Sequence, residues 1–124
     1  MPTGDSRSRA PAKRRGRERP RLSRSELEAL VEEATVDAYG DSEQAGGLFT
    51  LMEENLRLPF KTEVLGVEVA VEKVDLTEDD DIVVVCRKGR ARQRVRVLDL
   101  PLPKPPPEGW QWIEAYRYWV RGGR

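Results

Sequence analysis

The residues of this chain that can do chemistry are oxygen donors, because the side chains that dominate catalysis and transition-metal binding are missing or isolated. The 124 residues include no His and a single Cys, Cys86. This removes the commonest general base and the usual ligands of zinc, copper and haem. No phosphate-binding glycine loop, dinucleotide motif or Gly-x-Ser-x-Gly turn occurs. What is left is Asp, Glu, Asn and backbone carbonyls, the ligand set of hard cations such as calcium and magnesium.

Two groups of acidic residues have spacings that bring carboxylates together. In the first, Glu33, Asp37 and Asp41 are spaced by four residues. Asp41 and Glu43 then open the next helix. The second closes the following helix, where free carbonyls and the helix dipole favour a cation, and comprises Glu53, Glu54 and Asn55. Asp41 and Glu53 are about 18 Å apart along an unbroken helix, so the groups predict separate sites. The alternative is that these acids only face water.

A third acidic run, Thr77–Asp81, reads "TEDDD". It lacks the alternating Asp spacing and embedded Gly of an EF-hand loop. We therefore expect a solvated hairpin turn there, with no second element converging on its carboxylates.

The segments that must position these acids begin with two helices joined by a short turn. A cap at Ser23 or Ser25 and a stop at Gly40 bound the first helix. The second is expected to run from Asp41 to about Arg57.

Two glycines, Gly46 and Gly47, fall inside the second helix and each costs roughly 1 kcal/mol relative to Ala. Such a pair indicates either close approach of another backbone or a kink. We favour close packing of the first helix, since nothing else in this segment signals a break.

Beyond Pro59 the apolar period changes from helical to strand-like. Alternating Val residues predict a small, strongly bent antiparallel sheet of four or five strands, which commonly curls into an SH3-like or Sm-like β-barrel. A Pro-rich connector then leads to a short C-terminal helix, in which Trp112, Tyr116 and Trp119 are expected in the core. The predicted fold is α+β, a helical hairpin packed on a barrel. One domain is expected over residues 25–121, divided into helices (25–58), barrel strands (59–100) and the C-terminal helix (108–121).

Charge is sorted along the chain although its total is zero. Residues 1–24 carry nine Arg or Lys against two carboxylates, and with few apolar residues they are expected to form a disordered tail. Residues 26–81 carry a net charge of −14, and residues 82–124 are basic again. A block of −14 repels itself unless cations neutralise it.

The basic blocks support a competing interpretation, a nucleic-acid-binding module built on an SH3-like or Sm-like barrel. Its contacts would come from the tail and from one strand, at Arg14, Arg15, Arg17, Arg92 and Arg94. No exposed aromatic residues alternate with these arginines, so at most a weak contact with phosphates or another acidic partner is expected through residues 1–24.

The compartment expected from the sequence is the cytoplasm. Cys86 has no partner for a disulfide and lies in the apolar run "DIVVVC". No stretch approaches the roughly 18 apolar residues that span a bilayer, and the N-terminus lacks the apolar core of a secretory signal. A membrane partner is not expected, and without His or a substrate motif an enzyme is not expected either.

Segments of the chain follow a recognisable order: "VDAYGDSEQAGG", then "LMEENLRLPFKTEV", an alternating sheet, and "WIEAYRYWVRGG". Over about residues 26–121 this order resembles the small calcium-binding proteins of the cyanobacterial CcbP type. That family carries an Asp-Ala-Tyr turn, an acidic pair before a Leu-x-Phe-Pro-Phe step, an Sm-like or SH3-like barrel and an aromatic ending. Here "LFTL" replaces the family's aromatic run before the acidic pair, and Leu58 replaces its Phe before Pro.

The resemblance implies a calcium-binding protein, acting as a buffer or a sensor. By position it places the family's turn acid at Asp37, its helix-start acid at Glu43 and its acidic pair at Glu53 and Glu54. Together with Asp41, which the spacing adds, these residues form the expected ligand set for calcium.

Overall fold

The first helix begins at a reciprocal cap. In the computed structural model, which describes residues 21–123, Ser23 precedes α1 (Arg24–Ala34). The Glu26 amide donates to the Ser23 hydroxyl at 3.1 Å, and the Ser23 amide donates to the Glu26 carboxylate at 2.8 Å. Both amides would otherwise lack partners inside the helix. Of the tail expected over residues 1–24, residues 1–20 lie outside the described residues.

The same helix ends at Ala34, earlier than the stop predicted at Gly40. Thr35 leaves the helical conformation at φ −115°, and its hydroxyl donates to the Val31 carbonyl at 2.8 Å. At this point the second helix, α2 (Asp41–Asn55), comes against α1 through Gly47. A Cβ built on Gly47 would lie 2.1 Å from the Ala34 carbonyl oxygen. The close packing predicted from the glycine pair is confirmed at this residue.

Replacing Gly47 by Ala is expected to destabilise the protein by about 1 to 3 kcal/mol, because the new methyl group would overlap the backbone of α1. Gly46 is a matched control, since a Cβ there meets nothing within 4 Å. Gly46→Ala should therefore stabilise the helix by up to about 1 kcal/mol. Urea denaturation of both variants measures the difference, and losses of equal size would show that the helices do not touch at Gly47.

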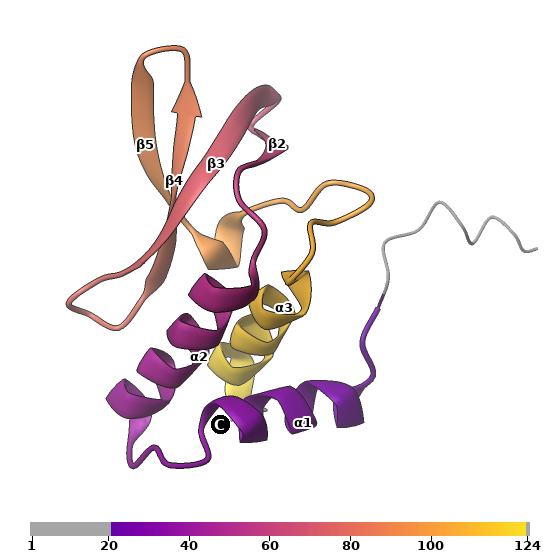
Figure 1. The fold of residues 1–124 in the computed structure, drawn as a ribbon, viewed down its shortest axis with the longest axis vertical. Helices are drawn as coiled ribbons and strands as arrows, with labels where there is room; N and C mark the ends of the chain where they lie inside the picture. The colour runs from indigo at the N-terminus through magenta and orange to yellow at the C-terminus, as the bar shows by residue number, and fades with distance from the viewer. Residues whose placement is uncertain (1–20, 124) are drawn as a thin grey trace, which may run out of the picture.

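The strands form one antiparallel sheet with the order β2-β3-β4-β5. Their bounds are β2 (Phe60–Val64), β3 (Val67–Leu76), β4 (Ile82–Lys88) and β5 (Ala91–Arg96). Among the described residues β2 and β5 are the two edges and do not pair, so the sheet is open and the predicted SH3-like or Sm-like barrel is not confirmed. The architecture is α+β, with helices packed on a four-stranded sheet (Figure 1).

The sheet bends at a break in its register. Val71 pairs with Cys86 and Lys73 with Val85, so β3 carries an extra residue, Glu72, between them. A bulge of this kind increases local twist and curvature. Beyond it, Val74 and its partner Val84 continue the buried face.

The C-terminal helix supplies the aromatic part of the core, as predicted. After the short helix η3 (Val97–Asp99), the chain forms α3 (Trp110–Tyr118) and a final wide turn, η4 (Trp119–Gly123). Trp112, Tyr116 and Trp119 are all buried. Arg117 is buried too, and its guanidinium donates to the carbonyls of Val97 and Leu100.

The helices occupy one end of the molecule and the free end of the sheet occupies the other (Figure 1). α2 and α3 lie side by side against the sheet, and α1 crosses beneath them. The buried residues of all three helices and of the sheet belong to one hydrophobic core. Among the described residues, no helix has the length and apolar character needed to cross a membrane.

Candidate functional site

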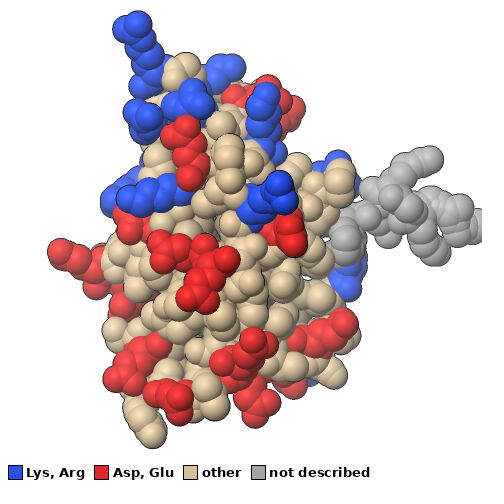
Figure 2. Space-filling view, in the orientation of Figure 1, with Lys and Arg blue, Asp and Glu red and all other residues tan. Residues whose placement is uncertain are grey.

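Charged side chains divide the surface into two regions. On the face drawn in Figure 2, acidic residues gather over the helical end and basic residues gather toward the free end of the sheet. No Lys or Arg occurs between Arg24 and Arg57, so α2 and the turn before it contain no cationic side chain. A surface of this kind attracts cations before any specific contact is made.

The turn between α1 and α2 spans residues 35–40 and is held by its backbone. The Ala38 amide donates to the Thr35 carbonyl at 3.0 Å, which closes the turn. Gly40 then begins α2 from φ 98°, ψ 166°, a conformation that side chains strongly disfavour. The Gly40 carbonyl accepts from the Gln44 amide at 3.1 Å, so α2 uses it as a hydrogen-bond acceptor. The carbonyls of Ala38 and Tyr39 accept no hydrogen bond from a described residue.

Glu43 folds back onto this turn from the first turn of α2. Its carboxylate accepts from the Tyr39 amide at 2.8 Å. Asp41 lies in the same helical turn and is also exposed. Both side chains lie at the N-terminal end of α2, where the helix dipole attracts negative charge.

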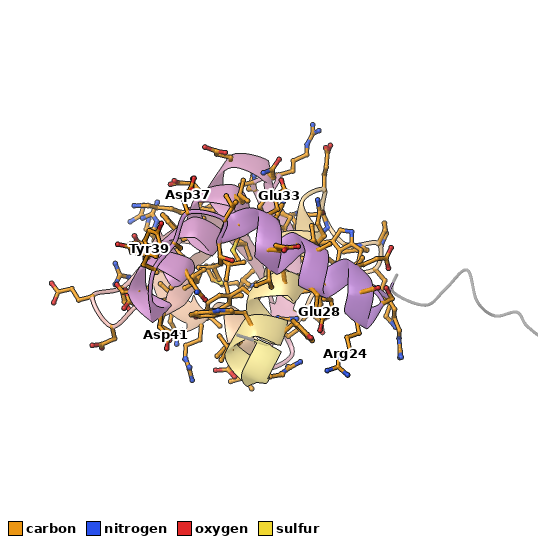
Figure 3. The ribbon with its side chains drawn as sticks, turned by 90° about the horizontal axis from the view of Figure 1, so that it is seen from below. Arg24, Glu28, Glu33, Asp37, Tyr39 and Asp41 are labelled. Carbon is orange, nitrogen blue, oxygen red and sulfur yellow. The ribbon has the colours of Figure 1, made fainter. Side chains whose placement is uncertain are left out.

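The structure does not bring the first acidic group together as the spacing predicts. Because α1 ends at Ala34, Asp37 lies in the turn and not at the end of the helix. Figure 3 shows Glu33 and Asp37 on one side of the turn region and Asp41 on the other, with Tyr39 between them. In residues 21–123, no group of three or more Asp, Glu, His or Cys side chains is arranged to hold a metal ion.

Glu53 and Glu54 are exposed on the last turn of α2, as predicted. The helix is continuous from Asp41 to Asn55, so these carboxylates lie a full helix length from the turn. The side-chain NH2 group of Asn55 donates to the Leu51 carbonyl at 2.8 Å.

The acidic hairpin after β3 is not the isolated tip that the sequence suggested. The Ser42 hydroxyl donates to the Asp80 carboxylate at 3.2 Å, which links the hairpin to the start of α2. Asp41, Asp79 and Asp80 line one shallow hollow there. Nothing in the local pattern signals this contact, since its partners are 38 residues apart.

Asp81, in the same hairpin, already has partners. Tyr116 donates to it through the phenol at 3.1 Å, and Arg96 donates at 2.7 Å. Hydrogen bonding to Asp81 raises the pKa of Arg96, while burial raises the pKa of the Tyr116 phenol. The Tyr116 oxygen also accepts from the Ile82 amide at 3.2 Å. These contacts give Asp81 a structural role that the sequence did not reveal.

The arginines of the competing nucleic-acid interpretation are engaged within the sheet. Arg94 pairs with Asp75 at 3.0 Å, and Arg92 reaches Glu72 at 3.4 Å. These ion pairs, which join β5 to β3 across β4, reduce the charge that a phosphate backbone would meet. Arg14, Arg15 and Arg17, the other residues named for that interpretation, lie outside the described residues.

Comparison with known proteins points to a family and a fold. A family model described as calcium binding, that of CcbP, matches residues 28–120. The crystal structure of CcbP from Anabaena superposes with a TM-score of 0.62 at 18% identity, covering 80% of this chain and 93% of that one. A calcium-binding protein in its calcium-binding form gives a TM-score of 0.63 at 19% identity, covering 78% and 90%. The comparison with curated proteins finds no match. At these identities the structural likeness establishes the fold, and the family match covers both acidic groups of the helical end.

Proposed function

Because the chain belongs to the CcbP family of calcium-binding proteins, we propose that it acts as a calcium buffer or sensor whose ligands lie at the helical end. The match over residues 28–120, which runs from α1 to the final turn, is the observation that carries this function. A role in binding, without catalysis, agrees with a chain that contains no His.

The first proposed site is the turn between α1 and α2. Asp37 would supply a carboxylate, and the carbonyls of Ala38 and Tyr39, which accept no hydrogen bond from described residues, would supply neutral oxygens. Asp41 and Glu43 flank the same turn, and their carboxylates would have to turn toward Asp37 to complete the shell. Calcium takes six to eight oxygens, mixing carboxylates, carbonyls and water, and it tolerates irregular geometry. This donor set therefore suits calcium better than magnesium, which demands near-octahedral ligands.

The second proposed site is the last turn of α2, with Glu53 and Glu54 as ligands. Both carboxylates are exposed, and they lie at the negative end of the helix dipole, where a cation is favoured. Two adjacent carboxylates bind calcium more weakly than a shell that also includes carbonyls, so we expect this site to fill second.

Calorimetric titration of the whole protein with calcium tests the proposal. The expected result is saturable binding, with calcium preferred over magnesium at the same ionic strength. Preference is the decisive feature, because diffuse attraction to an acidic surface would treat the two ions alike. Identical weak isotherms for both ions, or no binding heat at any temperature tried, would overturn it.

A further inference from the structure

Four large apolar side chains of the described residues are exposed, and they form two pairs at opposite ends of the molecule. Val36 and Tyr39, in the turn between α1 and α2, are 76% and 85% exposed. Leu65 and Val67, at the turn between β2 and β3, are 97% and 44% exposed. Figure 1 shows the first turn at the foot of the helices and the second at the free end of the sheet. Exposed apolar residues grouped in this way indicate contact surfaces.

The pair on the sheet borders a hollow of about 280 Å³, here called the sheet hollow. Its apolar lining includes Val64, Val69, Cys86, Ala91 and Val95. Side chains alternate between the faces of a strand, and Val71 and Cys86, which pair directly, belong to the core. The sheet hollow is therefore the continuation of the core face beyond the helices, left uncovered because the sheet does not close.

The rim of the sheet hollow is basic. Lys88 lines it, and no Asp or Glu does. Arg92 also borders it, but its guanidinium pairs with Glu72 on the other face of the sheet. Lys88 and its neighbour Arg90 form no ion pair with any described residue. The nearby acids Glu63 and Glu68 line a different hollow, beside Pro101. The sheet hollow therefore offers apolar surface surrounded by positive charge.

The pair on the helical turn has the opposite setting. Exposed carboxylates surround Val36 and Tyr39, namely Glu32, Glu33, Asp37, Asp41 and Glu43. Residues 32–43, here called the acidic turn, thus offer apolar side chains within negative charge. The two ends of one chain are complementary in both charge and hydrophobicity.

We propose that the acidic turn of one copy of this protein docks into the sheet hollow of a second copy. A contact between two sheet hollows would bring Lys88 toward like charge, whereas the head-to-tail contact brings it to carboxylates. Because the two surfaces lie at opposite ends, the contact does not close on itself, and copies add to one another in a chain. The contact is small and charged, so we expect it to weaken as the salt concentration rises.

Calcium is expected to weaken this association, a consequence that rests on the proposed function. Asp37 and Glu43 belong both to the acidic turn and to the first proposed calcium site. An ion held there would neutralise the negative charge that attracts Lys88. Binding of calcium and docking would therefore compete for the same carboxylates.

Two variants test the head-to-tail geometry directly. Leu65→Asp places a carboxylate at the sheet hollow, and Asp tolerates the positive φ of 52° at this residue. Tyr39→Ser removes the exposed aromatic ring from the acidic turn. In sedimentation experiments up to about 1 mM protein, the native chain should grow beyond a dimer and each variant alone should stay monomeric. An equimolar mixture of the variants should stop at a dimer, because one intact turn and one intact hollow remain.

The control is Lys104→Gln, which changes the net charge by the same amount as Leu65→Asp at an exposed residue outside both surfaces; it should associate like the native chain. The proposal is overturned if the native chain is monomeric or if either variant alone forms a dimer. A monomeric native chain would indicate that a different acidic partner occupies the sheet hollow.

In the same experiment, saturating calcium should weaken association of the native chain at least about fivefold, a modest coupling. If calorimetry shows calcium binding and association is unchanged, the coupling is wrong. If calorimetry shows none, the proposed function fails, and the variant mixture still decides the docking.

Discussion

Saturating calcium is expected to raise the melting temperature of this protein by about 10 to 20 °C. A ligand present at 100 times its Kd stabilises the folded state by about 2.7 kcal/mol. For a folded part of roughly 100 residues, each kcal/mol raises the melting temperature by about 4 to 8 °C. The acidic residues reinforce the effect, since the segment 26–81 carries a net charge of −14 whose self-repulsion a bound divalent cation reduces.

Differential scanning calorimetry with calcium, magnesium and NaCl at matched ionic strength separates binding from screening. Screening by salt acts on all surface charges and should give a small, similar shift in every salt. A shift that calcium alone produces, and that a chelator reverses, is the expected outcome. If NaCl reproduces the whole shift, stabilisation comes from charge screening and not from a site.

Local periodicity predicted the type and order of the main helices and strands, although α1 ends at Ala34 and not at Gly40. The apolar spacing of α2 places Leu48 and Met52 in the core, and both are fully buried. The spacing of four and three in the C-terminal helix correctly placed Tyr116 and Trp119 inside. Such patterns are readable because each records which face of one element is buried, and that information is local.

Closure of the sheet could not be predicted in the same way. The Val residues show that β3 is half buried and that β4 is largely buried. They do not show whether the edges β2 and β5 pair with each other. That outcome depends on curvature, on the bulge at Glu72, and on helices that cover the core face. Small sheets often close into barrels, but among the described residues this sheet is open and the predicted barrel is not confirmed.

The candidate site was predictable in its residue types and less so in its arrangement. Exposed acids at Asp37, Asp41 and Glu43 follow from their positions outside the apolar stripes. Their separation does not, because it depends on α1 ending at Ala34, where Thr35 leaves the helix and Gly47 packs closely. The contact between Ser42 and Asp80 likewise joins segments that only the folded chain brings near.

Asp37→Asn is expected to weaken calcium binding more than tenfold, which corresponds to more than about 1.4 kcal/mol. Among the acids of the first proposed site, Asp37 alone lies within the turn, next to the carbonyls of Ala38 and Tyr39. Glu43, by comparison, already accepts from the Tyr39 amide. Asn keeps the size of the side chain and one carbonyl oxygen, but it loses the charge and the second carboxylate oxygen, so the effect reports on ligation.

Glu78→Gln is the matched control for Asp37→Asn, since it removes one carboxylate from the acidic hairpin. Glu78 is exposed, and its side chain forms no hydrogen bond or ion pair with a described residue. Asp80 would be a poor control, because its carboxylate accepts from Ser42 beside the proposed site. The Glu78 variant changes the net charge as much as the Asp37 variant does, so diffuse attraction predicts equal losses at the two residues. A defined site at the turn predicts a loss below about threefold at Glu78, the size expected of a distant screened charge. Calorimetric titration of both variants distinguishes these outcomes, and equal losses would show that no site exists at the turn.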